Sequence, residues 1–224
     1  MICLISDRRR LAGGAATLEH SRSCLVAQAR FAADAGIDLV QIRERDLEAA
    51  DLASIVRAAV AATRGTATRV VVNDRLDVAI ACGADGVHLR GDSIAVSAAR
   101  SVAPHGFVVG RSVHSVDDAT RATDADYLIA GTVFRSASKS DAHPLIGIDG
   151  LRAIAESVRV PILAIGGITE TNVQAVARTG ASGCAAIGMF MDADAVGDAP
   201  CRAIALRSVV EAARRRFDSV KTTP

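Results

Sequence analysis

The chain has 224 residues, of which 50% are hydrophobic and only 3% are aromatic, with no Trp and a single Tyr. A core of Ala, Val, Ile and Leu suits parallel strands covered by helices rich in small residues, and the length suits one α/β barrel domain. The formal net charge of +1 argues against a nucleic-acid partner, because such proteins carry a strongly basic surface.

The hydropathy pattern and the cysteines indicate a cytoplasmic protein. No apolar run approaches the ~18 residues that a membrane-spanning helix needs, and no signal-peptide pattern precedes the first predicted strand. We therefore expect no contact with a membrane. The five cysteines are scattered without metal-ligand spacing, as is typical of reduced core residues: Cys3, Cys24, Cys82, Cys184 and Cys201.

Short apolar runs alternate with Ala-rich stretches of helical spacing along the chain. This alternation predicts a parallel sheet, and about eight such units in this length predict a closed (β/α)8 TIM barrel. We expect one domain over residues 1–224 with a flexible tail at Lys221–Pro224. The predicted strands are Ile2–Ser6, Leu39–Arg43, Val70–Asn73, Gly86–Leu89, Phe107–Ser112, Tyr127–Gly131, Ile162–Gly166 and Gly183–Ile187.

A doubly wound open sheet is the alternative fold, and it normally carries a glycine-rich phosphate loop after its first strand. Here the basic run Asp7–Arg10 follows that strand, so the barrel is favoured, and we expect Arg8–Arg10 to lie in a solvated loop. The long polar connection Phe134–Ile148 predicts a lid over the site. The predicted helices include Ser23–Ala35, Leu47–Thr63, Ser115–Thr123, Glu170–Thr179 and Ala195–Phe217.

The last two predicted strands both end in glycine, at Gly166-Gly167 and at Ile187-Gly188. Glycine lets backbone N–H groups approach a ligand closely, and the helix N-termini that follow favour anions. In barrels of this class the loops after the last two strands are the usual phosphate site. A role in tight turns alone would explain one such pair, but two in register favour phosphate binding.

Polar residues follow the other predicted strands. Because the carboxyl ends of barrel strands build the active site, these residues should converge on one rim. Guanidinium groups can grip an anionic substrate in a two-pronged hydrogen bond, and hydroxyls and amides complete such a site. The candidate substrate-binding residues are Gln41, Arg43, Arg45, Asn73, Ser112, Ser136, Ser138 and Lys139.

Several rim residues also have structural explanations. Arg43 could form an exposed ion pair with Glu44, and Asp74 could cap the helix that follows it. His88 lies in a nearly apolar strand, which favours a structural role. His114 directly precedes a helix start, and the near-neutral pKa of histidine makes it the best candidate for proton transfer.

Four motifs occur in order at the ends of predicted strands: Asn73-Asp74-Arg75, Gly86-Val-His88, Ser136-Ala-Ser138-Lys139 and Ala164-Ile-Gly-Gly-Ile168. In this order they resemble the thiamine phosphate synthase/TenI family over nearly the whole chain. The resemblance implies a (β/α)8 barrel of thiamine biosynthesis. The family's synthase branch joins a pyrimidine diphosphate to a thiazole phosphate and expels diphosphate with the help of Mg²⁺. Its TenI branch, the thiazole tautomerases, moves a proton to aromatise the thiazole phosphate without a metal.

The resemblance implies two substrate subsites. The pyrimidine diphosphate would be held by Gln41, Arg43, Arg45, Asn73, Ser112 and Lys139, with Arg45 in the place of a family lysine. The thiazole phosphate would be held by Ser136, Ala137, Ser138, Gly167, Ile187 and Gly188. The family usually has serine at the last of these positions, so Gly188 lacks a hydroxyl.

The family's Mg²⁺ site is the main departure. It uses two aspartates, of which one matches Asp74 while the other position falls on Ser93, next to Asp92. Mg²⁺ demands nearly ideal octahedral geometry, so the loss of one carboxylate should weaken the site. We therefore expect weak Mg²⁺-dependent activity unless Asp92 completes the shell.

The favoured prediction is a cofactor-free, tautomerase-like proton transfer by His114. Its small-molecule phosphate substrate would be bound at Gly167, Ile187 and Gly188. A Mg²⁺-dependent thiamine phosphate synthase is the close alternative, and a non-catalytic phosphate-ligand binding protein is the third. A homo-oligomer is left open.

Overall fold

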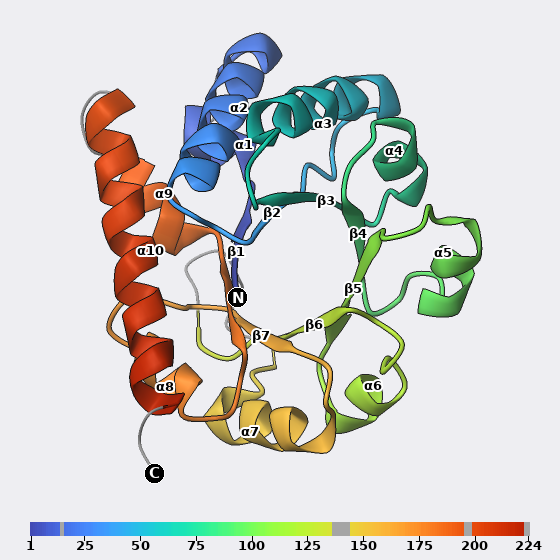
Figure 1. Ribbon diagram of the computed structural model, residues 1–224, viewed down its shortest axis with the longest axis vertical. Helices are drawn as coiled ribbons and strands as arrows, with labels where there is room; N and C mark the ends of the chain where they lie inside the picture. The colour runs from blue at the N-terminus through green and yellow to red at the C-terminus, as the bar shows by residue number, and fades with distance from the viewer. Residues whose placement is uncertain (14–15, 136–143, 195–198, 222–224) are drawn as a thin grey trace.

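The computed structural model describes residues 1–13, 16–135, 144–194 and 199–221. Eight parallel strands close into a barrel in chain order, with β1 beside both β2 and β8 (Figure 1). Every predicted strand is present with ends within one residue of the prediction, which confirms the (β/α)8 fold. The strands are β1 (Ile2–Ile5), β2 (Leu39–Ile42), β3 (Arg69–Asn73), β4 (Gly86–Leu89), β5 (Val108–Val113), β6 (Tyr127–Gly131), β7 (Ile162–Ile165) and β8 (Gly183–Ala186).

Apolar side chains fill the inside of the barrel. Parallel strands are buried on both faces, which is why they are nearly continuous apolar runs in the sequence. Because side chains alternate between the two faces of a strand, the inner row continues to Gln41, Asn73 and Ile187 at the carboxyl end. The inner cluster consists of Cys3, Ile5, Leu39, Val71, Val108, Tyr127, Ile129, Leu163 and Ala185.

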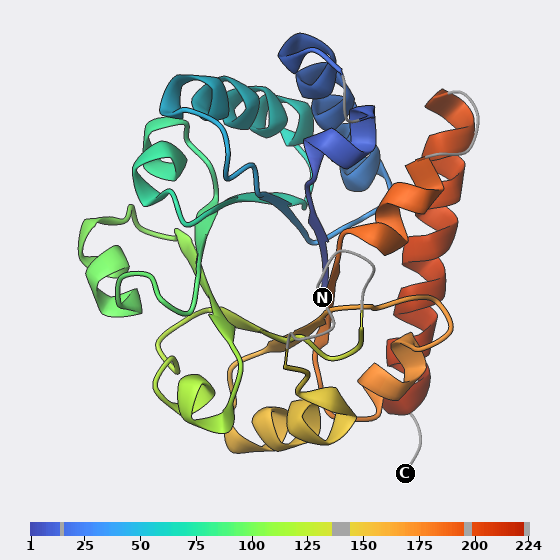
Figure 2. The same cartoon turned by 180° about the vertical axis from the view of Figure 1, so that it is seen from behind.

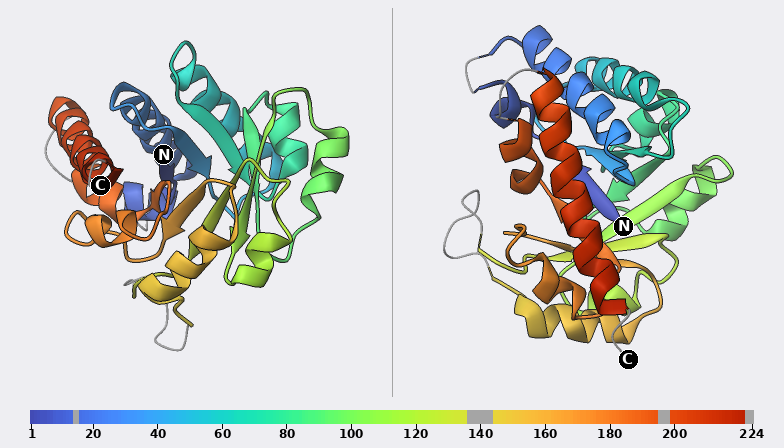
Figure 3. Two further views of the ribbon diagram at one scale, coloured as in Figure 1. Left: turned by 60° about the horizontal axis from the view of Figure 1, so that its bottom comes forward. Right: turned by 60° about the vertical axis from the view of Figure 1, so that its left-hand side comes forward.

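Helices surround the barrel on its outside (Figures 1 and 2). The long α10 lies across this outer surface and contacts α8, α9 and α2 (Figure 3). The helices are α1 (Arg8–Ala12), α2 (Leu18–Asp34), α3 (Ala49–Thr63), α4 (Leu76–Ala81), α5 (Val96–Val102), α6 (Val116–Thr120), α7 (Gly147–Ser157), α8 (Val173–Ala177), α9 (Gly188–Asp194) and α10 (Ala199–Lys221).

The segment after β1 differs from the prediction. It forms the short helix α1 instead of a loop, because the Asp7 side chain caps it by accepting a hydrogen bond of 3.1 Å from the backbone N–H of Arg10. Arg8 is only 8% exposed, so the prediction of a solvated basic run was wrong for this residue. Residues 136–143 of the predicted lid lie outside the described residues, as does all of the predicted tail after Lys221.

None of the described helices combines the length and the apolar composition that a membrane crossing requires. Four of the five cysteines are free thiols: Cys3, Cys24, Cys82 and Cys184.

Candidate active site

Gln41 and Asn73 form the inner floor of the rim. Gln41, on β2, is 2% exposed, and its Nε2 donates a hydrogen bond of 3.0 Å to Oδ1 of Asn73 on β3. The Oε1 atom of Gln41 is buried and receives no hydrogen bond from any described residue. An unsatisfied buried acceptor costs about 1–3 kcal/mol. The floor is therefore suited to a ligand that brings a hydrogen-bond donor.

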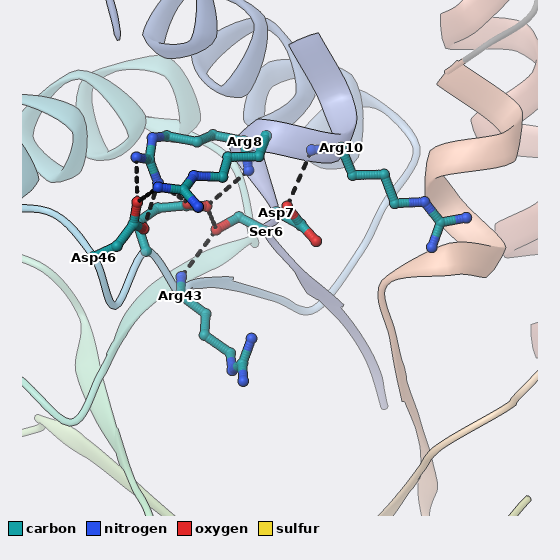
Figure 4. A network of polar contacts seen from close by, with 8 residues as sticks. Ser6, Asp7, Arg8, Arg10, Arg43 and Asp46 are labelled. Atoms are coloured by element: carbon teal, nitrogen blue, oxygen red, sulfur yellow. Dashed lines mark hydrogen bonds and ion pairs between the residues drawn. The ribbon is translucent and has the colours of Figure 1, made fainter. Parts of the chain in front are cut away.

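Arg43 follows β2 and is half-buried. Its backbone N–H donates a 2.9 Å hydrogen bond to Oγ of Ser6, and its side chain extends away from the neighbouring polar cluster (Figure 4). Burial lowers the pKa of this guanidinium from its ordinary value, and the nearby charge of Arg45 lowers it further. Burial and the neighbouring charge both destabilise the charged form of the Arg43 guanidinium. A bound anion would therefore stabilise that charged form.

The expected ion pair between Arg43 and Glu44 is not formed, and that prediction was wrong. Glu44 is 6% exposed and faces Arg8, whose Nη1 lies 3.0 Å from its Oε2. Oε1 of Glu44 also accepts hydrogen bonds from Ser6 Oγ at 2.5 Å and from the backbone N–H of Arg8 at 3.1 Å. Two further bonds of 2.7 Å join the Arg8 guanidinium to Asp46 (Figure 4).

This network ties the end of β1 to the loop after β2 and fixes the backbone of Arg43 through Ser6. The sequence analysis missed it, because the hydrogen-bonding partners are 36 to 38 positions apart. The available signal was Asp7, an aspartate directly after the predicted strand Ile2–Ser6, at the N-cap position of a helix.

Replacing Glu44 by glutamine is expected to lower the free energy of unfolding by about 1.5–3 kcal/mol, the usual contribution of hydrogen bonds to a charged group. The substitution keeps the side-chain volume and leaves Arg8 with Asp46. Urea unfolding at neutral pH measures this change. Glu211→Gln on α10, where the carboxylate is 56% exposed, is the matched control and should change stability by less than ~0.5 kcal/mol. Equal effects of the two substitutions would show that the buried network adds no particular stability.

Asp74 follows β3 in the left-handed conformation, with φ of 61°. It does not cap the next helix, because α4 has no side-chain cap hydrogen bond, so the capping alternative was wrong. One Asp74 carboxylate oxygen accepts a 3.4 Å hydrogen bond from the Arg90 backbone N–H, and the other lies 3.7 Å from the Arg90 guanidinium. The same guanidinium donates two hydrogen bonds to the carboxylate of Asp92. Ser93 lies in the turn after β4, where its N–H donates to the carbonyl of Arg90.

Asp74 and Asp92 thus share one cation, the guanidinium of Arg90. Carboxylate oxygens are the preferred protein ligands of Mg²⁺, which is commonly held by one or two of them together with substrate phosphates. No group of three or more His, Cys, Asp or Glu residues suited to a metal occurs in the described part of the chain. The donor set fits Mg²⁺ that is completed by a phosphorylated substrate.

Two small cavities open on this side of the rim. One of about 210 Å³ is lined by Arg45, Arg75 and Arg90 together with Asn73 and Asp74, among others. A second, of about 340 Å³, shares Arg45 with the first and includes Arg43. Cavities lined by several guanidinium groups suit an anion with many oxygens, such as a diphosphate.

His88 has the structural role that was predicted for it. It lies 2% exposed on β4, with Nδ1 3.2 Å from the Tyr127 hydroxyl and Nε2 2.8 Å from Oγ of Ser112. Burial lowers the pKa of His88 to about 3, so the imidazole is neutral at physiological pH. His88 therefore holds the Ser112 hydroxyl at the inner rim.

His114 follows β5, and its ring Nδ1 donates a hydrogen bond to the carbonyl of Gly131. It lines a cavity of about 580 Å³ whose other lining residues come from the start of α6, the end of β6, α7 and the residues just before α7. Most of them are apolar, such as Leu145 and Ile154. This cavity is separate from the two that the arginines line. The catalytic role of His114 stays a prediction.

The predicted phosphate site lies at the ends of β7 and β8. The strand register pairs Ile165 with Ala185, so the turns that contain Gly167 and Ile187 begin at the same level of the barrel. A Cβ on Gly167, where φ is 60°, would lie 2.3 Å from the carbonyl oxygen of Arg135, so only glycine fits. Gly188 begins α9. Three other predicted site residues, Ser136, Ser138 and Lys139, lie outside the described residues.

The closed barrel and the polar residues at the carboxyl ends of its strands place the chain among the (β/α)8 barrels, whose active sites lie at that rim. A sequence model described as "Thiamine monophosphate synthase" matches residues 15–190. The chain belongs to the thiamine phosphate synthase/TenI family, as the motifs predicted.

Relatives of similar length support this assignment. The chain is 47% identical to a thiamine-phosphate synthase of Methanoregula boonei over 161 residues, which are 71% of this chain and 74% of that protein. It is 38% identical to a thiamine-phosphate synthase of Moorella thermoacetica, over 92% and 93% of the two chains. The solved thiamine phosphate pyrophosphorylase from Pyrococcus furiosus is 32% identical, with a TM-score of 0.75 over 98% of this chain and 96% of that one.

These relatives favour a different reaction from the one first predicted. All three carry names of the synthase or pyrophosphorylase, and none is named a tautomerase. The comparisons do not support the tautomerase prediction and favour its synthase alternative, so the chain is assigned to the enzymes of thiamine biosynthesis.

Proposed function

We propose that this protein is a Mg²⁺-dependent thiamine phosphate synthase, which joins a pyrimidine diphosphate to a thiazole phosphate. In this reaction a bond from the pyrimidine's methylene carbon to the thiazole nitrogen forms, and the bond from that carbon to the diphosphate oxygen breaks. The observation that carries the proposal is the buried, unsatisfied Oε1 of Gln41 beside a rim of arginines. This combination suits a ring with a hydrogen-bond donor that is attached to a diphosphate.

The residues of the rim have two roles: some bind the pyrimidine ring and others bind the diphosphate. Gln41 and Asn73 orient the pyrimidine ring, and the Ser112 hydroxyl, held by His88, faces the same inner space. Arg43, fixed by its backbone bond to Ser6, binds the diphosphate together with the other guanidinium groups. Their charges stabilise the negative charge that builds on the departing diphosphate, and they are already in place before it forms.

Asp74 and Asp92 would hold Mg²⁺, with Arg90 holding the two carboxylates in position. When bound, the ion supplies additional positive charge to the leaving diphosphate. The glycine ends of β7 and β8 bind the phosphate of the second substrate, and only β1 lies between β8 and β2, the strand that Arg43 follows. Both substrates are small phosphorylated molecules.

The decisive experiment combines the purified protein with pyrimidine diphosphate and thiazole phosphate, with Mg²⁺ or with a chelator. Thiamine phosphate and diphosphate should form together in equal amounts, and only with Mg²⁺. A parallel assay follows aromatisation of the thiazole precursor without metal. Aromatisation without any thiamine phosphate would restore the tautomerase interpretation, and tight phosphate binding with neither reaction would support a binding protein.

A further inference from the structure

Arg10 lies in α1, which follows β1, and its side chain approaches the predicted phosphate site at the end of the neighbouring strand β8. A Cβ placed on Gly188 would lie 3.3 Å from Nη1 and 3.5 Å from Nη2 of Arg10. The two residues come from opposite ends of the barrel sequence. Figure 4 shows the Arg10 side chain extending from α1 toward the ribbon that follows β8. The guanidinium therefore lies directly against the position that a Cβ at residue 188 would take.

The fold explains this placement. The register of β1 with β8 pairs Leu4 with Ala186, so the segments that follow these strands run side by side. The cap of Asp7 starts α1 at once after β1, and α1 contacts α9. Residues two apart on a helix do not face the same side. Arg8 accordingly points to Glu44, while Arg10 points to the end of β8.

We infer that Arg10 is an additional ligand of the thiazole phosphate and takes the place of a side chain at position 188. This inference rests on the proposed function. A guanidinium can donate two parallel hydrogen bonds to phosphate oxygens, whereas a hydroxyl donates one. A side chain at position 188 would compete with the guanidinium for space, so glycine at 188 and arginine at 10 form a matched pair.

A charged side chain such as Arg10 affects how strongly the site prefers a phosphorylated substrate over an unphosphorylated one. A hydroxyl contributes a neutral hydrogen bond, while a guanidinium attracts the charge of the phosphate itself. Arg10 therefore increases the preference for the phosphorylated thiazole over its unphosphorylated alcohol. The diphosphate at Arg43 has its own cations and does not depend on Arg10.

The test measures the KM of each substrate separately in Arg10→Ala. We expect the KM for thiazole phosphate to rise by about 10- to 100-fold, the usual effect of losing hydrogen bonds between charged groups. The KM for pyrimidine diphosphate should change less than ~3-fold, and circular dichroism should show an intact fold. Arg215→Ala, at an arginine that is 70% exposed on α10, removes the same charge from a distant surface and should change neither KM.

A second variant tests the replacement directly. Adding Gly188→Ser to Arg10→Ala supplies a hydroxyl in the space that the arginine leaves, and it should recover part of the lost affinity for thiazole phosphate. In the presence of Arg10 the same serine should give no gain, because the guanidinium lies against its Cβ position. Calorimetric titration with thiazole phosphate and with its alcohol measures binding without turnover.

These measurements separate the role of Arg10 from the synthase activity itself. If the unsubstituted protein makes thiamine phosphate but Arg10→Ala behaves like Arg215→Ala, the inference alone is overturned. Equal rises in both KM values would show that Arg10 only supports the local fold, which also overturns it. An unsubstituted protein that neither binds thiazole phosphate nor makes product overturns the proposed function and the inference together.

Discussion

Lowering the pH below about 6.5 is expected to destabilise the folded barrel by ~1.4 kcal/mol per pH unit through His88 alone. The side chain is fully buried, and burial lowers its pKa to about 3. In the unfolded chain the same imidazole has an ordinary pKa near 6.5. Between these two values the unfolded state binds a proton that the folded state does not. The free energy of unfolding therefore decreases as the pH falls through this window.

Urea unfolding at half-unit intervals from pH 7 to pH 4 measures the slope. His88→Gln removes the titrating group and should flatten the profile, even if the variant is less stable at every pH. His105→Gln is the control, because it removes a histidine whose side chain is exposed at the surface. A His88→Gln profile parallel to that of the unsubstituted protein would assign the acid sensitivity to other groups.

The burial of His88 also affects the candidate active site, through its contact with Ser112. His88 links the Tyr127 hydroxyl to the Ser112 hydroxyl, and protonation would leave both ring nitrogens as donors. Ser112 could then no longer donate to the ring. Because folded His88 stays neutral down to about pH 3, the orientation of Ser112 should be kept for as long as the barrel stays folded.

The strands were the most predictable part of the fold, for a physical reason. Each is a short apolar run such as Val70–Val72 or Ile162–Ala164, buried on both faces, so its limits coincide with the change to polar residues. Helix limits were less predictable. Their ends depend on caps such as Asp7, which satisfies one backbone N–H of a helix only five residues long.

The residues of the rim could be predicted from the sequence, but the ion pairs and contacts that they form with other loops could not. Gln41, Arg43 and Asn73 follow from the rule that strand ends build the site in a barrel. The pairing of Arg8 with Glu44 and the approach of Arg10 to Gly188 depend on which loops meet across the barrel closure. Adjacent charges in the sequence suggested local ion pairs, whereas the structure forms the buried ones between different loops.

The preference for a tautomerase came from His114, the best candidate for proton transfer, and from Ser93 in place of an aspartate of the metal site. The structure gives this substitution less weight, because Asp92 already shares the cation of Arg90 with Asp74. This geometry supports the proposal that Asp92 takes the place of the missing carboxylate. This could not be read from an ungapped alignment, which fixes positions and not side-chain directions.

Asp74→Asn is expected to reduce Mg²⁺-dependent formation of thiamine phosphate by about 10³-fold, because a bound metal contributes several kcal/mol of charge stabilisation in the transition state. Asparagine has the same shape and tolerates the left-handed conformation that Asp74 adopts. The fold should therefore be retained and only the negative charge lost. Asp117→Asn, at a carboxylate that is 80% exposed on α6, is the matched control and should keep full activity.

The second ligand is identified by two further variants. Asp92→Asn should raise the Mg²⁺ concentration needed for half-maximal activity, because it removes the other carboxylate that Arg90 holds. Adding Ser93→Asp to Asp92→Asn should restore part of the Mg²⁺ affinity, since it returns a carboxylate to the same turn. The measurement is kcat as a function of Mg²⁺ concentration with both substrates saturating. If Asp74→Asn keeps the Mg²⁺ dependence of the unsubstituted protein, the metal is held elsewhere and the rim carboxylates serve only to position Arg90.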